Sequence, residues 1–256
     1  MFDSIIFTNA LWVFSLSSII VLCVLIFGKL FAPYGKMTSN VWGSVMIPAR
    51  LGWIIMESPT SILFVVFLLL CDHLNNGLIV LFFVWQFHYF YRSFIFPFLT
   101  RHSKPMPILM MFSGMSFQLI NIYFQAGWLF FVAPKDMYGG DYLQSPPFII
   151  GFVIFLIGSF INRQADYILK NLRKPGETEY KIPYGGLYRF ISCPNYLGEI
   201  IIWLGWAVLL KSWVGLSFFM WTVANLVPRA LTSHKWYKEN FTDYPSERKA
   251  IIPGIL

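Results

Sequence analysis

Long apolar runs recur along the whole chain, interrupted by short segments rich in glycine, proline, asparagine and charged residues. A helix that spans a lipid bilayer needs about 20 mostly apolar residues. The pattern predicts seven such helices, at residues 5–31, 43–71, 76–99, 105–132, 147–171, 194–211 and 213–238. Pro59 lies inside the second segment and predicts a kink or a break there. We therefore expect an all-α integral membrane protein with a single transmembrane domain, residues 1–256.

The composition fits such a protein and excludes a soluble globular domain of this size. Hydrophobic residues make up 57% of the 256 residues and charged residues only 12%. The apolar run within the first 31 residues is longer than the core of a signal peptide and has no basic start, so we expect a retained helix. The three cysteines, Cys23, Cys71 and Cys193, form no Cys-x-x-Cys pair, so we expect neither a disulfide framework nor a metal site.

Basic residues alternate between the predicted loops and set the orientation of the chain. Lys29 and Lys36 lie at the loop after the first helix, whereas the loop after the second contains no lysine or arginine. The alternation continues to the end, and the loop at about 172–193 and the tail carry most of the positive charge. Because basic loops stay in the cytoplasm, we expect the N-terminus outside and the C-terminus in the cytoplasm. The same rule accounts for the net charge of +7, so we expect no nucleic-acid partner.

Ionisable side chains inside apolar segments are candidates for function, because each costs about 2.5–3.5 kcal/mol at the bilayer centre. Arg50, Trp53 and Glu57 share one face of the second helix, at spacings i, i+3 and i+7. Glu57 is either a proton-holding carboxyl in a cavity or one half of an ion pair with Arg50 that braces the bundle. On the third helix Tyr89 shares a face with Arg92, although aromatic residues near a helix end also form interfacial belts.

A polar stripe lies on the fifth predicted helix. Asn162, Asp166 and Arg173, at i, i+4 and i+11, indicate one wall of a polar ligand groove, or else a hydrogen-bonded seam between helices. Asn195 and Glu199 follow the start of the sixth helix, whose free N–H groups suit a phosphate. The chain contains no GxGxxG, P-loop, HExxH or GxSxG motif, so we expect no Rossmann fold around a nucleotide cofactor.

Several of these segments resemble the steroid 5α-reductase family, the 3-oxo-5α-steroid 4-dehydrogenases. The matching residues run from about residue 30 to the end and are densest over 158–256. They include the sequences ARLGWIIME, HYFYR, DYILKNLRKPGE, YKIPYGGL, NYLGEIIIW and FTDYPSERKAIIP. Segments as long as these are specific to the family.

The resemblance implies an NADPH-dependent reduction of a Δ4-3-oxo-steroid, with hydride addition at C5. It implies that Tyr89 and Glu57 are the catalytic residues that hold the C3 carbonyl, and that Trp53 and Arg50 contact the substrate. It also implies that the N-terminal half mainly forms the substrate cavity and that residues 158–256 mainly form the NADPH site. The NADPH-binding residues would be Asn162, Asp166, Arg173, Tyr180, Lys181, Asn195, Glu199, Arg229, Tyr237 and Arg248.

Two lysines depart from the family pattern. Lys104 and Lys181 stand where arginine is expected. Because an ammonium group cannot make a bidentate contact, these changes affect cofactor affinity rather than the class of reaction.

Three other functions fit parts of the sequence. A reductase of a polyprenal or an enoyl-CoA has a related C-terminal region, but Glu57 together with Tyr89 favours a steroid. A membrane methyltransferase that uses S-adenosylmethionine has a similar helix start and basic tail, but the intact segment 166–177 argues against it. A transporter would use carboxylates at the midplane, but the chain contains no inverted repeat.

The expected partners are a steroid that enters from the bilayer and the membrane lipids themselves, and we expect a monomer. The expected location is the endoplasmic reticulum membrane in a eukaryote and the inner membrane in a bacterium.

Overall fold

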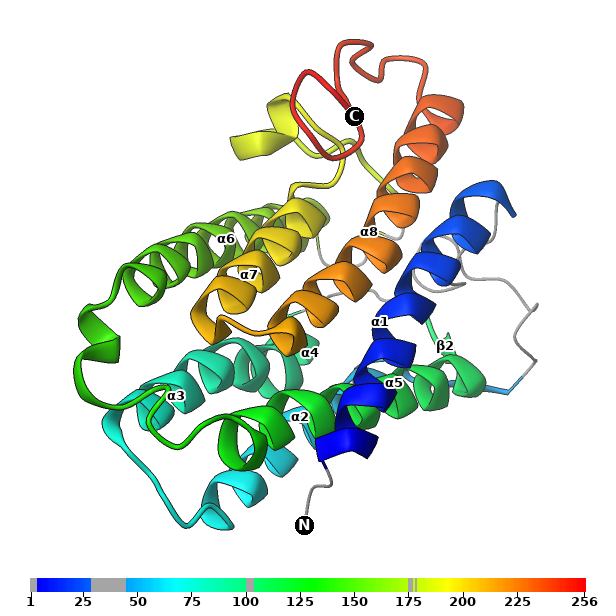
Figure 1. The fold of residues 1–256 in the computed structure, drawn as a ribbon. Coiled ribbons are helices and arrows are strands. Elements are labelled where there is room, and N and C mark those ends of the chain that lie inside the picture. Colours follow the sequence, from blue (N-terminus) through cyan, green and yellow to red (C-terminus); the bar gives the residue numbers. More distant parts are fainter. Residues whose placement is uncertain (1–3, 29–44, 100–103, 175–176, 178) are drawn as a thin grey trace. The chain divides into compact units, whose positions relative to one another are not determined.

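The computed structural model describes residues 4–28, 45–99, 104–174, 177 and 179–256. Most of these residues are helical, which confirms the predicted all-α class (Figure 1). The chain divides into two compact units. Unit 1 comprises Met1–Trp12 and Ala32–Ile149, and unit 2 comprises Val13–Phe31 and Ile150–Leu256. The first helix, α1 (Ser4–Phe27), contributes residues to both units.

Unit 1 contains two long helices that start at the same small sheet. Strands β1 (Met46–Ile47) and β2 (Met106–Pro107) pair in antiparallel fashion directly before α2 and α5. The two helices pack along their length, and their contacts advance together from Met56 at Gly114 to Glu57 at Gln118, so they run in the same direction. The helical elements are α2 (Ala49–Leu69), α3 (Asn76–Phe90), α4 (Phe96–Leu99), α5 (Ile108–Gly127), the π-helical turns η3 (Tyr91–Ile95) and η4 (Trp128–Val132), and the 3₁₀ turn η5 (Gly140–Gln144).

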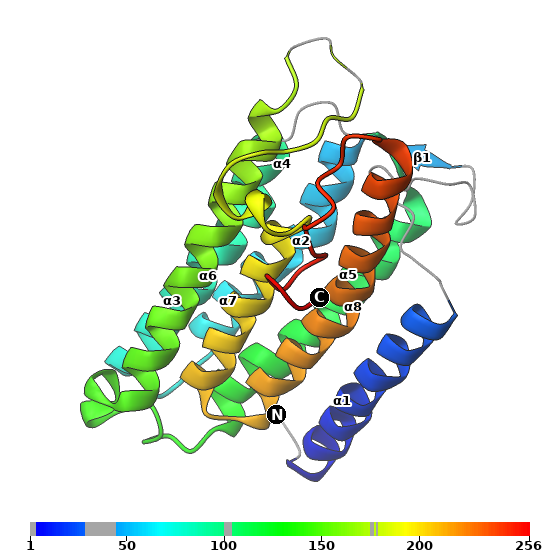
Figure 2. The same cartoon turned by 90° about the horizontal axis from the view of Figure 1, so that it is seen from above.

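Unit 2 combines the second part of α1 with three further helices and a tail. It contains most of α6 (Pro146–Asn171), the 3₁₀ turn η6 (Gly186–Arg189), α7 (Pro194–Leu210) and α8 (Trp213–Asn240). Figures 1 and 2 both show α6, α7 and α8 side by side. Lys211 ends α7 in the left-handed conformation, with φ 47°, and the Ser212 hydroxyl accepts a hydrogen bond from Gly215 N at 3.3 Å to cap α8. This two-residue connection makes α7 and α8 neighbours.

Glycines bring α6 and α7 unusually close together. A Cβ atom added to Gly158 would lie 2.5 Å from Ile202 N, and one added to Gly198 would lie 2.5 Å from Asn162 N. One added to Gly205 would lie 2.5 Å from Phe155 N. Real Cβ atoms do not come this close to backbone, so only glycine fits at these positions. Small residues commonly permit such close contacts between membrane helices.

The apolar segments form the predicted helices, with one difference in their number. Six helices of the described chain are long and apolar enough to cross a membrane: Ser4–Phe27, Ala49–Leu69, Asn76–Leu99, Ile108–Val132, Pro146–Asn171 and Trp213–Asn240. They make the protein a multi-pass membrane protein. The segment predicted at 194–211 does form α7, but this helix has only 17 residues, at the lower limit of a spanning helix. Six of the seven predicted spanning segments are therefore confirmed as helices of sufficient length, and the seventh forms the shorter α7.

Local details of two segments differ from the expectation. Pro59 lies inside α2 without breaking it, because α2 runs continuously from Ala49 to Leu69. The segments predicted at 43–71 and 105–132 begin with the two-residue strands rather than with helix. A pair of residues is too short to show the alternation that predicts a strand. Lys29 and Lys36, which helped to set the orientation, lie outside the described residues.

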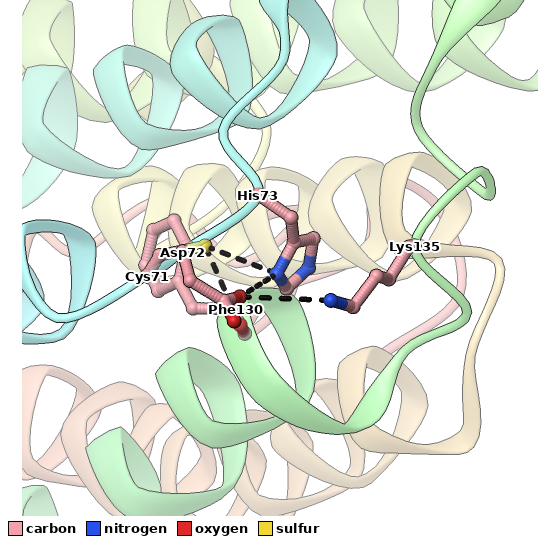
Figure 3. Close-up of polar contacts among 5 residues, drawn as sticks. All are labelled: Cys71, Asp72, His73, Phe130 and Lys135. Atoms are coloured by element: carbon pink, nitrogen blue, oxygen red, sulfur yellow. Dashed lines mark hydrogen bonds and ion pairs between the residues drawn. The ribbon is translucent and has the colours of Figure 1, made fainter.

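Polar residues join the end of α2 to the segment after η4 (Figure 3). The Cys71 thiol donates to Phe130 O at 3.5 Å, and His73 Nδ1 lies 2.7 Å from Asp72 Oδ1. Lys135 Nζ lies 3.8 Å from the same carboxylate oxygen. The hydrogen bond with His73 and the charge of Lys135 lower the pKa of Asp72. Asp72 is exposed, so these contacts contribute little to stability.

Cys71 offers a test of the predicted orientation, because it is half-buried and lies just after α2. With the N-terminus outside, the end of α2 faces outward as well. We expect a membrane-impermeant maleimide to label spheroplasts of a bacterial host that carries the protein in its inner membrane with Cys71 as the only cysteine, after Cys23→Ser and Cys193→Ser. The matched control keeps only Cys193, which is buried and should not react. Labelling of Cys71 only after permeabilisation would reverse the predicted orientation.

Candidate active site

Three buried polar side chains from three helices form a hydrogen-bonded chain in unit 1. They are Glu57 of α2, Tyr89 of α3 and Gln118 of α5, with exposed fractions of 6%, 3% and 9%. Gln118 Nε2 donates to Glu57 Oε2 at 2.7 Å, and the Tyr89 hydroxyl donates to Gln118 Oε1 at 3.4 Å. The Gln118 amide therefore links the two residues for which the family resemblance implies a catalytic role.

Packing of the neighbouring apolar residues holds these side chains in place. Met56 lies against Gly114 of α5, so the adjacent Glu57 meets α5 one turn later, at Gln118. On α3, the Tyr89 ring packs on Trp85 at 4.6 Å between centroids. Trp85 is stacked in turn on Phe64 of α2, at 4.7 Å and an interplanar angle of 9°. The aromatic contacts therefore place the phenol beside α2 and α5.

Arg92 adds a positive charge to this group. Its Nη2 atom lies 3.9 Å from Glu57 Oε1, and its guanidinium lies over the rings of Phe96 and Trp53, at 4.8 and 5.4 Å from their centroids. Arg92 stands in the π-helical turn η3, an irregularity often found at functional sites. Trp53 thus joins the group through Arg92.

Arg50 lies apart from this group. It is exposed, its Nε donates to Pro97 O at 3.3 Å, and its guanidinium lies 5.2 Å from the centroid of Phe98. The nearby cation for Glu57 is thus Arg92 rather than Arg50. A contact between Arg50 and substrate stays a prediction.

Gln118 was missed in the sequence, although a signal for it exists. Gln118, Asn121 and Gln125 recur at i, i+3 and i+7 on α5, and all three are buried. Such a stripe of amides on a membrane helix indicates a polar neighbour on the facing helix. The neighbour for Gln118 is Glu57.

A second polar group lies in unit 2, where α6 meets the start of α7. Asn162 Nδ2 donates to Asn195 O at 3.0 Å and lies 3.3 Å from Glu199 Oε1. Asn162 and Glu199 are both buried. The structure therefore brings together three residues that the sequence assigned to one site.

Tyr188 is buried at the centre of this region and was not predicted. Its electrostatic neighbours include Tyr237, Asp166, Cys193 and Tyr196. Burial, and then the nearby Tyr237, raise the pKa of Tyr188 well above its ordinary value, so its hydroxyl keeps its proton. That hydroxyl has no hydrogen-bond partner in the described part of the chain. The phenol is therefore a buried, protonated donor with no acceptor among the described residues.

Arg248 is a buried cation in the tail of unit 2. It is only 2% exposed, its Nη1 donates to Pro183 O at 3.1 Å, and its guanidinium lies over Tyr184 and Tyr244, at 4.8 and 5.3 Å. Among the described residues its Nε atom has no hydrogen-bond partner, and no carboxylate forms an ion pair with it. A buried arginine in this state suits an anion such as a phosphate.

The remaining predicted cofactor residues lie in smaller groups in unit 2. Arg173 lies over the ring of Tyr180, at 5.2 Å from its centroid. Lys181 Nζ lies 2.5 Å from Glu177 Oε2, and the pKa of Glu177 is lowered first by this hydrogen bond. Arg229 Nε donates to the Tyr196 hydroxyl at 2.8 Å.

Taken together, the residues of unit 2 fit the chemistry of a phosphorylated dinucleotide. The unsatisfied donors of Arg248 and Tyr188 suit phosphate oxygens, and the amides and carboxylate around Asn162 suit hydroxyl and amide groups.

Comparisons with known proteins point to one family. The model of the family 3-oxo-5-alpha-steroid 4-dehydrogenase matches residues 104–256. The chain is 42% identical over 232 residues to steroid 5-alpha-reductase DET2 of Arabidopsis thaliana, covering 88% of this chain and 87% of that protein. It is 40% identical over 248 residues to 3-oxo-5-alpha-steroid 4-dehydrogenase 1 of Bos taurus, covering 92% of both. For the human protein of the same name the identity is 38% over 235 residues, with 86% and 88% covered.

The hydrogen bond from Gln118 to Glu57 generates a prediction about stability. Gln118→Met keeps the volume of the side chain but removes both hydrogen bonds, so a buried carboxyl loses a donor. We expect a loss of about 1–3 kcal/mol in the free energy of unfolding, seen as a lower melting temperature in detergent. Leu119→Met, at the exposed neighbouring position, is the control and should change stability by less than about 0.5 kcal/mol. Equal melting temperatures for both variants would show that the amide does not stabilise Glu57.

Proposed function

Because the chain belongs to the 3-oxo-5-alpha-steroid 4-dehydrogenase family, it is an oxidoreductase that acts on CH–CH bonds, and we propose that it uses NADPH to reduce the Δ4 double bond of 3-oxo-steroids to 5α-3-oxo-steroids. The observation that supports this assignment beyond the family is the buried chain Tyr89–Gln118–Glu57. In this chain a buried phenol and a buried carboxyl contact the same Gln118 amide, which supports a proposal that both act on one carbonyl oxygen.

In this proposal Tyr89 and Glu57 polarise the C3 carbonyl of the steroid. When bound, NADPH would supply the hydride that adds to C5. Negative charge then develops on the C3 oxygen, and hydrogen bonds from the Tyr89 phenol and a protonated Glu57 stabilise this enolate, which takes up a proton at C4 to give the saturated ketone. Donors held in a buried site need no reorganisation as this charge develops.

The hydrogen bonds among Tyr89, Gln118 and Glu57 allow Tyr89 to exchange its Gln118 partner for the substrate carbonyl. The bond from Tyr89 to Gln118 is long, at 3.4 Å, so turning the phenol toward a carbonyl oxygen costs little. Gln118 donates to Glu57 Oε2 at 2.7 Å, so Oε1 is the oxygen that would carry the proton. Arg92 Nη2 lies 3.9 Å from Oε1 and favours the ionised carboxylate, so Arg92 would have to move away when Glu57 takes up this proton. Trp53, linked to the group through Arg92, would contact the steroid as an apolar surface.

Unit 2 would bind the cofactor. Arg248, Arg173 and Lys181 would contact phosphates. Lys181 would first have to exchange its carboxylate partner, Glu177, for the phosphate. Asn162, Asp166, Asn195 and Glu199 would contact hydroxyl and amide groups, and Tyr180, Arg229 and Tyr237 would complete the site.

The substrate would enter from the bilayer, since steroids dissolve in lipid. We propose that the protein works as a monomer among membrane lipids. The endoplasmic reticulum membrane in a eukaryote, or the inner membrane in a bacterium, would supply the substrate.

Substitutions at Tyr89 and Glu57 test the proposed chemistry. Tyr89→Phe removes one donor to the developing oxyanion, and we expect turnover to fall about 100- to 1,000-fold. Glu57→Leu should reduce turnover at least as much, whereas Glu57→Gln should keep substantial activity if Glu57 acts as a neutral donor. Turnover of testosterone with NADPH is measured by chromatography of the 5α-reduced product.

The same preparations should bind NADPH with near-normal affinity in a thermal-shift assay, because the proposed cofactor residues belong to the other unit. If Tyr89→Phe and Glu57→Leu both turn over steroid at the parent rate, the two residues do not polarise the carbonyl. If the parent protein forms no 5α-product, the proposed reaction itself is wrong.

Cofactor binding can be tested without any turnover. NADPH should raise the melting temperature of the purified protein by mass action, and S-adenosylmethionine should not. Arg173→Ala should weaken NADPH binding by about 1.5–3 kcal/mol, as expected for a lost contact to a charged group. Lys174→Ala removes the same charge one residue later, at an exposed position, and should have a smaller effect. Stabilisation by S-adenosylmethionine alone would instead support a methyltransferase.

A further inference from the structure

The hydroxyl of Ser192 joins three segments of unit 2. Ser192 lies just before α7 and is 3% exposed. Its Oγ atom lies 2.6 Å from His234 Nδ1 of α8, 2.6 Å from the Tyr244 hydroxyl of the tail, and 3.2 Å from Lys249 O. A single buried hydroxyl thus has three hydrogen-bond partners.

The capacity of a serine hydroxyl fixes the direction of these bonds. The hydroxyl offers one hydrogen and two lone pairs, and a backbone carbonyl can only accept. All three bonds can form together only when Ser192 donates to Lys249 O and both His234 Nδ1 and the Tyr244 hydroxyl donate to Ser192. This assignment from the network puts the neutral His234 proton on Nδ1.

This arrangement differs from a nucleophilic serine and its base. A general base would accept the serine proton at the ring nitrogen that faces the hydroxyl, but His234 Nδ1 donates there. Among the described residues, the charged groups that act on His234 are Lys238 and Lys249, and no carboxylate orients it as a base. The network therefore holds side chains in place and does not activate Ser192.

The residue held most directly is Tyr244, which lies between two predicted cofactor residues. Its ring is stacked on Tyr237, with centroids 5.3 Å apart and an interplanar angle of 8°. The Arg248 guanidinium lies 5.3 Å from the centroid of the same ring. A ring fixed by Ser192 therefore sets the positions of both Tyr237 and Arg248.

The backbone of the tail is held by other contacts. Ser192 N donates to Lys249 O at 2.8 Å, Cys193 N to Ala250 O at 3.1 Å, and Lys249 N to Phe190 O at 2.9 Å. Ala250 and Ile251 pack with Cys193 and Ala230 in a small apolar cluster. These contacts hold the backbone of the tail without the Ser192 hydroxyl. The hydrogen bonds of the Ser192 side chain therefore act mainly on the side chains of His234 and Tyr244.

We propose that Ser192 and His234 are positioning residues for the cofactor: they orient Tyr244, which aligns Arg248 and Tyr237 for a phosphate-bearing nicotinamide dinucleotide. This inference rests on the proposed function of the site. It assigns a role to three side chains that make no proposed contact with the cofactor themselves.

The test measures the dissociation constant of NADPH, its KM and kcat, and the melting temperature of the ligand-free protein. Ser192→Ala and Tyr244→Phe each remove hydroxyl bonds with little change in shape. We expect each to weaken NADPH binding about 5- to 10-fold, the size of one hydrogen bond. The KM for NADPH should rise in proportion, while kcat and the KM for steroid stay near the parent values. Ser233→Ala is the matched control, since Ser233 is a buried serine of α8 beside His234, and it should leave NADPH binding unchanged.

Two substitutions at His234 separate positioning from general stability. The amide nitrogen of His234→Asn can occupy the place of Nδ1 and donate to Ser192, whereas the longer side chain of His234→Gln places its amide near the position of Nε2. We expect Asn to retain NADPH affinity within about 2-fold and Gln to lose about as much as Ser192→Ala. This pair decides the question even if Ser192→Ala or Tyr244→Phe fails to fold.

Two results would overturn the inference while the parent protein still binds NADPH. One is parent-like affinity in Ser192→Ala and Tyr244→Phe. The other is equal affinity in His234→Asn and His234→Gln. Failure of the parent protein to bind NADPH would instead contradict the proposed function.

Discussion

The close backbone contact between α6 and α7 is the constraint on which the rest of unit 2 depends. Gly158, Gly198 and Gly205 leave no room for a side chain between the two helices. Because the Gly198 backbone lies directly against Asn162, the Asn162 amide can reach both Asn195 O and Glu199. A larger residue at position 198 would push the two helices apart and break the hydrogen bonds of Asn162 to Asn195 O and Glu199. Polar residues on two apolar helices thus become one site because the helices touch through glycine.

A different constraint acts in unit 1, where a carboxyl is buried between three helices. A buried acid is tolerated only with donors around it, and Glu57 has the Gln118 amide and the more distant Arg92 guanidinium. These partners keep the carboxyl in one position beside the Tyr89 phenol. The interactions that make burial possible therefore also hold in place the two groups to which the proposed reaction assigns the carbonyl oxygen.

The C-terminal tail packs against the segment before α7 and against α8. Its backbone pairs with the segment before α7, and its side chains Tyr244 and Arg248 complete a surface begun by α8. Arg248 is buried among aromatic rings and carbonyl oxygen rather than carboxylates. An anion that binds there meets a cation that no acid in the described chain neutralises, which favours a phosphate.

The sequence alone determined the helices and selected most residues of the candidate site. Apolar length is a local property, so six of the seven predicted segments form spanning helices and the seventh forms the shorter α7. Spacing and family resemblance selected Asn162, Asn195 and Glu199, which meet in the structure. Tertiary structure alone decided the partners: Gln118 lies 61 residues from Glu57, and Tyr244 lies 52 residues from Ser192. It also placed Arg92 rather than Arg50 beside Glu57. Helical periodicity shows which residues share a face of one helix, but which helix that face meets depends on packing between segments distant in the chain.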